Sequence, residues 1–263
     1  MKYMKTQIAV VLIARNEGER LRKALESIPN GLQIVYVDSK STDDSVALAK
    51  QKGCIVVELD MSLPFTAARA RNEGFAALIR RAAQIEYVQF MDGDCEIAPD
   101  WLPKAIAALT DHEEVALVCG RRREKYPQSS QYTSLVDMEW HTPLGYIEAC
   151  GGDFLIRASA FQEVEGFDPS WIAGEEPEFC LRLYQRGWKL FATSQDDVSR
   201  CAYYMFFTAL ATFHTVRPCL CRRVLELRSH AGMLLPEAGP LHPFLVIFPA
   251  FYHPNHVHSE SWA

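Results

Sequence analysis

Residues 86–94 read EYVQFMDGD, an apolar run that stops at two aspartates separated by one glycine. The run from Glu86 to Met91 has the length and composition of a buried strand. Asp92 and Asp94 would then lie at its carboxyl end, where open α/β sheets bind their ligands. Carboxylate oxygens are hard ligands that suit Mg²⁺ or Mn²⁺, and Gly93 allows a tight turn or a close approach. An Asp-Gly-Asp turn is common by chance, but its place after a buried strand makes it a candidate metal site.

The sequence on both sides of this run alternates short apolar stretches with segments of helical periodicity. Further strands are predicted at Ile8–Ala14, Gln33–Asp38, Ile55–Leu59, Val115–Cys119, Asp153–Arg157 and Trp188–Thr193. Helices are predicted from Glu17, from an N-cap at Ser41 through Lys50, and at Thr66–Ala83, Pro99–Leu109 and Glu175–Arg186. Such alternation is typical of an α/β fold, in which a mostly parallel sheet is flanked by helices.

Composition excludes several classes of protein. The 263 residues are 49% hydrophobic and 23% charged, which is ordinary for a globular protein with one large α/β domain or two small ones. A net charge of −6 provides no basic face for nucleic acid, and the one dense basic cluster, Arg121–Arg123, is either a solvated surface or a local anion site. The apolar run Ile8–Ala14 is too short to cross a bilayer or to act as a signal. The eight cysteines show no paired CxxC spacing that would suggest zinc. Because no secretory signal is recognised, we expect reduced thiols in a cytoplasmic protein, and because of the net charge we expect no nucleic-acid partner.

Three further groups of polar residues have both a functional and a purely structural interpretation. Asp38, which ends the second predicted strand, can accept hydrogen bonds from a base or ribose, or belong to a helix-capping loop. Arg69 and Arg71 can face a diphosphate with their planar charged groups, or lie on a solvated helix surface. Glu175 and Glu176 can supply a general base, or complement the dipole of the helix that they begin. Taken one by one, these residues leave the choice open.

Taken in order, the segments resemble glycosyltransferase family 2, whose members are inverting enzymes with the GT-A fold. The resemblance covers roughly residues 6 to 193 and rests on VVLIARNE (10–17), VDSKSTD (37–43), ARARNEG (68–74), FMDGD (90–94), GGD (151–153), GFD (166–168) and GEEPEF (174–179). The ordered set is far more specific than any single motif. It implies a Rossmann-like GT-A fold that transfers a sugar from a nucleotide-sugar donor to a hydroxyl acceptor by a single displacement with inversion.

Carried over position by position, the resemblance implies a role for each candidate site residue. The nucleotide is bordered by Ala14, Asn16, Glu17 and Asp38, and the diphosphate or the metal turn has Arg71 and Asn72 nearby. Asp92 and Asp94 are the metal and ribose aspartates, and Gly152 and Asp153 contribute to substrate binding. Glu176 is the catalytic base, with Glu175 as its neighbour. The implied cofactor is Mn²⁺ or Mg²⁺. The implied acceptor is a carbohydrate or a lipid-linked molecule of polysaccharide biosynthesis, which would bring a cytoplasmic enzyme to the inner face of the plasma membrane as a peripheral protein.

The sequence departs from the family pattern in three places. Ala14-Arg15 stands where members often have Thr-Tyr, and Ser39 stands where a second Asp is frequent, so the resemblance does not identify the nucleotide. Glu176 stands where Asp is commoner, which lengthens the base by one methylene group. Members commonly continue with a His-Asp segment, whereas this chain continues with a His-, Pro- and Cys-rich stretch. We therefore divide the chain into a GT-A domain at 1–195 and a divergent tail at 196–263, partly helical or disordered, which is either a diverged end or a shifted reading frame.

This tail keeps a second function under consideration. A C-terminal histidine that sometimes helps to hold the metal in this fold has no clear match, and His214 is a weak substitute. The alternative is a catalytically impaired module that binds a sugar nucleotide with the same fold. A nicotinamide-dependent oxidoreductase is disfavoured, because no GxGxxG sequence follows the first predicted strand.

Overall fold

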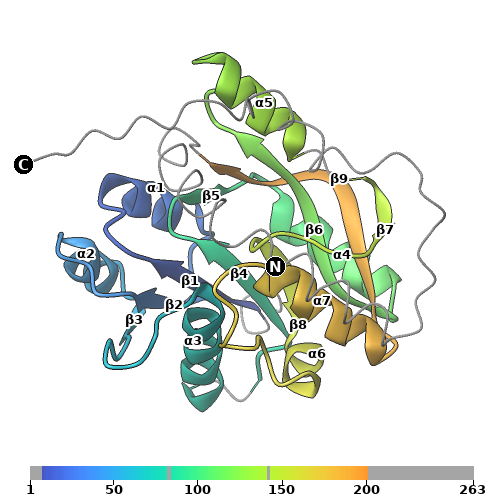
Figure 1. The fold of residues 1–263 in the computed structure, drawn as a ribbon, viewed down its shortest axis with the longest axis horizontal. Coiled ribbons are helices and arrows are strands. Elements are labelled where there is room, and N and C mark those ends of the chain that lie inside the picture. The colour runs from blue at the N-terminus through green and yellow to red at the C-terminus, as the bar shows by residue number, and fades with distance from the viewer. Residues whose placement is uncertain (1–7, 82–83, 141–142, 201–263) are drawn as a thin grey trace, which may run out of the picture.

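The computed structural model describes residues 8–81, 84–140 and 143–200 (Figure 1). Its strands are β1 (Ile8–Ala14), β2 (Gln33–Asp38), β3 (Ile55–Glu58), β4 (Tyr87–Asp92), β5 (Cys95–Ile97), β6 (Val115–Glu124), β7 (Gly145–Ile147), β8 (Phe154–Arg157) and β9 (Lys189–Arg200). Its helices are α1 (Glu19–Ser27), α2 (Ser45–Gln51), α3 (Ala67–Arg81), α4 (Trp101–Asp111), α5 (Gln131–Glu139), α6 (Ala158–Glu163) and α7 (Glu175–Gln185).

Within the described residues the strands form one sheet in the order β3-β2-β1-β4-β8-β6-β9-β5, and β7 pairs with β9. The strands β1, β2, β3 and β4 are parallel to one another, and β6 is parallel to β9. Between β4 and β6, β8 runs antiparallel to both, so β4 and β6 point the same way. The prediction of an α/β fold with a mostly parallel sheet is confirmed, and β5, β7 and β8 are its antiparallel members.

Helices cover both faces of the sheet because each strand alternates its apolar side chains between them. In β4, Val88 and Phe90 face a core that includes side chains of α3, α6 and α7. Tyr87 and Met91 face the opposite core, which includes side chains of α1, α2 and α4. Both cores consist of buried apolar side chains, and because such cores are closely packed, the strand ends between them are held in fixed positions.

Register brings the predicted polar residues to one edge of the sheet. Ala14 pairs with Asp38 across β1 and β2, and Ile13 pairs with Asp92 across β1 and β4. The helix α3 lies very close to this part of the sheet. A Cβ atom at Gly74 would lie 2.5 Å from Val11 Cγ1, so only glycine permits the approach.

Several boundaries differ from the predicted ones. The helix predicted from Ser41 is wrong at its start: α2 begins at Ser45, because the Ser41 hydroxyl accepts a hydrogen bond from the Asn16 N–H and the Ser41 N–H donates to Asp38. The elements α5, α6, β5 and β7 have no counterpart in the prediction. The strand β9, the last one within the described residues, continues to Arg200 and so passes the domain boundary proposed at residue 195.

The remainder of the predicted tail, including His214, lies outside the described residues. Among the helices that the structure does describe, none has both the length and the hydropathy that a membrane crossing needs.

Candidate active site

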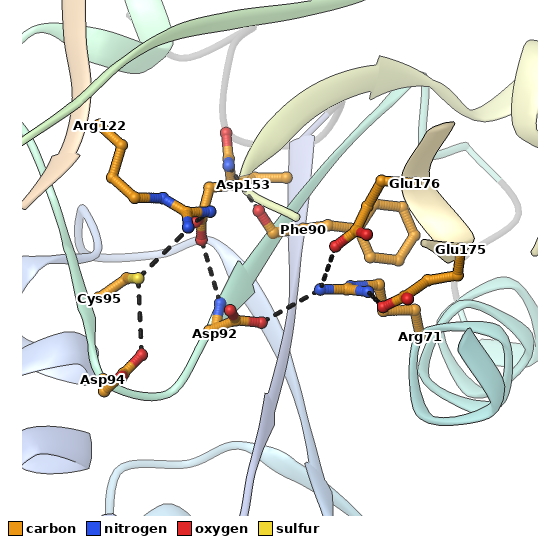
Figure 2. Close-up of polar contacts among 10 residues, drawn as sticks. Arg71, Phe90, Asp92, Asp94, Cys95, Arg122, Asp153, Glu175 and Glu176 are labelled. Atoms are coloured by element: carbon orange, nitrogen blue, oxygen red, sulfur yellow. Dashed lines mark hydrogen bonds and ion pairs between the residues drawn. The ribbon is translucent and has the colours of Figure 1, made fainter. Parts of the chain in front are cut away.

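Arg71 lies at the centre of a group of acidic side chains at the carboxyl edge of the sheet (Figure 2). The helix α3 places it there, and its side chain is only 3% exposed. Its Nη1 donates to Glu175 Oε1 at 3.0 Å, and its Nη2 donates to Asp92 Oδ1 at 3.2 Å and lies 3.5 Å from Glu176 Oε1. The Phe167 ring packs against the guanidinium, with 5.4 Å between Cζ and the ring centroid. Arg71 therefore connects the end of β4 to the first turn of α7.

Local sequence explains why the acids of α7 point to this place. Gly174 precedes the helix with a φ of 81°, a left-handed conformation that glycine adopts without strain. Pro177 occupies the first turn, where its missing N–H costs no hydrogen bond. Glu175 and Glu176 are at the amino end of the helix, where a negative charge is favoured by the helix dipole.

The two glutamates differ in their environment. The Glu175 side chain is 9% exposed and hydrogen-bonded to Arg71, whereas the Glu176 side chain is 20% exposed. Burial raises the pKa of Glu176 to about 7; Arg71 opposes this rise, and the charges of Glu175 and Asp92 add to it. A carboxyl group with this pKa is about half ionised near neutral pH, where it can take a proton from a hydroxyl group and release it again.

Three potential metal ligands lie together at the turn after β4. The carboxylate oxygens of Asp92 and Asp94 and the Cys95 sulfur are within 4.8 Å of one another. A Cβ atom at Gly93 would lie 2.4 Å from the Cβ of Ala14, so glycine allows this turn to rest against β1. Two carboxylates on a rigid turn fit a divalent cation that keeps waters and shares further oxygens with a phosphate group.

The excess of negative charge among the side chains around this turn also favours the binding of a cation. The carboxylates of the site are those of Asp92, Asp94, Asp153, Glu175 and Glu176, and their guanidinium partners are Arg71 and Arg122. When all are ionised, negative charges exceed positive ones by three in a partly buried region, which is unfavourable. A divalent cation would offset most of this excess, so the residues present fit Mn²⁺ or Mg²⁺.

Asp153 and Arg122 close the other side of the turn. Asp153 immediately precedes β8, and its Oδ1 accepts the backbone N–H of Asp92 at 3.1 Å. Its Oδ2 accepts a hydrogen bond from Arg122, which also lies over the Trp140 ring at 5.5 Å. A Cβ atom at Gly152 would lie 2.2 Å from Arg71 Nη2 and 3.1 Å from Glu176 Oε1. Gly152 therefore leaves space for the groups that the site brings together.

Another cluster of predicted residues forms where β1 and β2 end. Asp38 is buried, and its carboxylate accepts hydrogen bonds from the Tyr36 hydroxyl at 2.7 Å and the Ser41 N–H at 2.8 Å. Asn16, at a φ of 56°, accepts the Thr42 N–H through Oδ1 at 2.7 Å. These bonds hold the loops after β1 and β2 side by side at the carboxyl edge.

Asn72 and Arg69 of α3, and Glu17 of the loop after β1, have their own hydrogen-bond or ion-pair partners. The Asn72 amide exchanges two hydrogen bonds with the backbone of Phe167, at 2.7 and 2.9 Å. It thus holds the residue whose ring packs against Arg71. Arg69 donates to Glu73 and to loop carbonyls, so it does not join Arg71 among the carboxylates. Glu17 forms an ion pair with Arg20 at 2.6 Å.

Sequence reasoning did not identify Cys95 as a neighbour of Asp92 and Asp94, Arg122 as a partner of Asp153, or Trp140 as the ring beside Arg122. The basic cluster Arg121–Arg123 is divided by the alternation of β6: Arg121 and Arg123 pair with Asp137, and Arg122 points the opposite way to the carboxylates. Strand parity was the available signal, since alternate residues of a strand face opposite sides. The register that brings Arg122 to Asp153 could not be read from the sequence.

Comparison with known proteins agrees with this geometry. The family model described as "Glycosyl transferase family 2" matches residues 9–163. The "Pre-mycofactocin glycosyltransferase" of Mycobacterium tuberculosis (strain CDC 1551 / Oshkosh) is 28% identical over 200 residues, which cover 70% of this chain and 40% of that protein. An uncharacterized glycosyltransferase of Mycobacterium bovis is 32% identical over 120 residues, 44% of this chain and 49% of that protein. The chain thus spans less than half the length of these curated relatives.

Two glycosyltransferases of known structure have a similar fold. Glucosyl-3-phosphoglycerate synthase from M. tuberculosis, in complex with Mn²⁺, UDP and glucosyl-3-phosphoglycerate, aligns with a TM-score of 0.59 and 20% identity over 90% of this chain and 83% of that one. Mannosyltransferase PcManGT from Pyrobaculum calidifontis, in complex with GDP-Man and Mn²⁺, aligns with a TM-score of 0.59 and 16% identity over 90% and 67% of the two chains. The fold is therefore the GT-A fold, and the chain belongs to glycosyl transferase family 2.

Proposed function

We propose that the chain is an inverting glycosyltransferase, in which the turn at Asp92–Asp94 binds the donor and Glu176 activates the acceptor. The observation that carries the proposal is the position of Arg71, which contacts Asp92 on one side and Glu175 and Glu176 on the other. A carboxylate turn suited to a divalent cation that can bind a diphosphate, and a carboxyl group with a raised pKa, are thereby held on either side of one guanidinium. This arrangement is what a displacement between a donor and an acceptor requires.

In the proposed reaction, ionised Glu176 takes the proton from an acceptor hydroxyl group. The hydroxyl oxygen then forms a bond to the anomeric carbon as the bond from that carbon to the diphosphate oxygen breaks. Attack from the face opposite the leaving group inverts the configuration, and no covalent enzyme intermediate is needed. Glu175 and Arg71 act as positioning residues, because their buried contact fixes the first turn of α7.

Asp92 and Asp94 would hold the divalent cation, which when bound offsets the negative charge that builds on the leaving diphosphate. Asp153 holds the turn through the Asp92 N–H, and Gly152 leaves room beside it. We assign the nucleotide to the edge formed by Ala14, Asn16, Glu17 and Asp38. Asn72, predicted near the diphosphate, is assigned a supporting role through its bonds to Phe167.

The similar structures support this choice of ligands. Their complexes contain UDP or GDP-Man together with Mn²⁺, so we propose a nucleotide-sugar donor and Mn²⁺ or Mg²⁺ for this chain. For the acceptor we propose a carbohydrate or a lipid-linked hydroxyl compound. Such an acceptor is compatible with a cytoplasmic enzyme that works at the inner face of the plasma membrane.

A donor panel tests the proposal. Melting temperatures measured with UDP-, GDP- and dTDP-sugars, with and without Mn²⁺, identify the donor, because a ligand that binds only the folded state raises the melting temperature. Release of nucleoside diphosphate is then followed for the wild type, Asp94→Ala and Glu176→Gln. We expect donor binding that depends on the metal, weakened in Asp94→Ala and kept in Glu176→Gln, with turnover lost in both.

Three outcomes would contradict parts of the proposal. Full activity of Asp94→Ala would exclude the metal role, and full activity of Glu176→Gln would exclude the base. Donor binding without turnover across a broad panel of acceptors would favour the binding module over the enzyme.

A further inference from the structure

Three cysteines lie together near the candidate active site, each on a segment that contributes a residue to it. Cys150 immediately precedes Gly151 and Gly152, Cys180 belongs to α7, and Cys119 belongs to β6. All three are free thiols. The Cys150 and Cys180 sulfurs are 3.9 Å apart, and the Cys150 thiol also hydrogen-bonds with Cys119. A disulfide bond is about 2 Å long, so the first two sulfurs would have to approach by roughly 2 Å to form one.

The thiols of Cys150 and Cys180 lie next to the contact between Gly152 and Glu176. Cys180 follows Glu176 by four residues in α7, so it lies one turn further along the same face of the helix. A Cβ atom at Gly152 would lie 2.2 Å from Arg71 Nη2 and 3.1 Å from Glu176 Oε1, so the loop backbone already lies close to both side chains. A movement of Cys150 toward α7 would therefore disturb the groups around the proposed base.

The two thiols differ in their access to solvent. Cys150 is half-buried, whereas Cys180 is fully buried. A small oxidant can therefore reach Cys150 and not Cys180. Hydrogen bonds with Cys119 and Cys180, together with burial, raise the pKa of Cys150 well above its ordinary value, so its thiol is protonated at neutral pH and reacts slowly. The pair should therefore stay reduced until an oxidant is abundant.

We propose that Cys150 and Cys180 form a reversible disulfide that lowers turnover at the proposed active site. The effect on turnover rests on the proposed function, whereas the bond itself does not. The oxidant is a low-molecular-weight disulfide. The Cys150 thiolate attacks one of its sulfurs, which forms a mixed disulfide and releases one small thiol. The Cys180 thiolate then attacks the Cys150 sulfur and displaces the second small thiol, so two electrons pass to the oxidant and both cysteine protons leave with the small thiols.

Treatment of the full chain with oxidised glutathione at about pH 8.5, where more of the thiol is ionised, tests the proposal. The readouts are mass spectrometry of alkylated, unreduced peptides and release of nucleoside diphosphate from the donor found in the panel. We expect a peptide that links Cys150 to Cys180, a loss of turnover of roughly tenfold or more, and recovery of turnover after dithiothreitol cleaves the bond. Cys150→Ala should keep its turnover under this treatment. Cys54→Ala, a matched control that removes another half-buried thiol, should behave as the wild type does.

Each contrary outcome identifies what fails. Absence of the linked peptide with excess oxidant, or a link from Cys150 to Cys119 in its place, would overturn the pairing. A linked peptide with unchanged turnover would overturn the effect on the site and leave the proposed function intact. Equal loss of turnover in the treated wild type and Cys150→Ala would assign the loss to other cysteines and overturn that effect as well. A reduced wild type without turnover would refute the proposed function and this effect together, whereas the linked peptide would still establish the bond.

Discussion

Replacement of Arg71 by methionine is the most demanding test of the site. The substitution keeps an unbranched apolar stem and removes the charge that faces Glu175, Glu176 and Asp92 at 3.0–3.5 Å. Removing one partner of a buried ion pair costs about 3–5 kcal/mol, because the remaining charges stay buried without compensation. For a domain of this size, we expect the melting temperature to fall by roughly 6–20 °C.

The dependence of this loss on pH distinguishes electrostatics from packing. Burial already raises the pKa of Glu176 from 4.5 to about 7, so the folded state binds its proton more tightly than the unfolded chain does. Stability from this group is therefore complete below about pH 4.5 and is lost as pH rises through 7. Without Arg71, which lowers this pKa, the loss extends to higher pH. Arg71→Met should then be more destabilising at pH 8 than at pH 5.

Urea denaturation of the wild type, Arg71→Met and Arg80→Met at pH 5 and pH 8 measures these differences. Arg80 is an exposed arginine of the same helix, so its substitution should change stability by no more than about 0.5 kcal/mol. Equal destabilisation by Arg71→Met at both pH values would refute the electrostatic argument. A loss no greater than that of Arg80→Met would refute the central place given to Arg71.

Three other substitutions test separate contacts. Glu176→Gln should lower turnover about 10²- to 10⁴-fold and abolish the decrease in stability between pH 4.5 and 7. If the variant still lost stability over this pH range, a group other than Glu176 would be responsible for the decrease. Gly152→Ala places a Cβ atom 2.2 Å from Arg71 Nη2, so the turnover of the donor should drop. The secondary structure measured by circular dichroism should stay unchanged. Turnover equal to that of the wild type would show that the guanidinium can move away from the new methyl group. Asn72→Ala removes both hydrogen bonds to Phe167 and should lower the free energy of unfolding by about 1–3 kcal/mol. Asn72→Asp should recover less than half of this loss. A urea midpoint of Asn72→Ala equal to that of the wild type would contradict the prediction.

The sequence was sufficient to predict the features that depend on local pattern. The apolar run before Asp92 has one plausible conformation, and its place after three similar strands indicates a sheet with the turn at its edge. The acids and the proline at the start of α7 likewise specify a helix start. In these segments propensity, burial and capping all favour the same structure, so prediction succeeds.

Features that depend on tertiary contacts could not be predicted. Ser41 has the residue type of an N-cap, yet Asn16 and Asp38 use its polar groups, and the helix starts four residues later. The helix α5 lacks a clear apolar face, so its periodicity gives no signal, although a local capping box between Ser130 and Thr133 stabilises its first turn. Arg122 reaches Asp153 only because of the register among β6, β8 and β4, which no local pattern encodes.

The order of events in folding follows from how far apart in the chain the partners of Arg71 are. Its contact with Asp92 spans 21 residues, whereas its contact with Glu175 spans 104. Long loops close slowly, because the entropy of closure is lost before the contact forms. We therefore expect a refolding chain to complete the β1–β4 half before α7 docks. In that interval Arg71 would already face Asp92 while the base was still absent, so affinity for the donor should recover earlier than turnover. Parallel measurement of nucleotide binding and product release during refolding would reveal this delay.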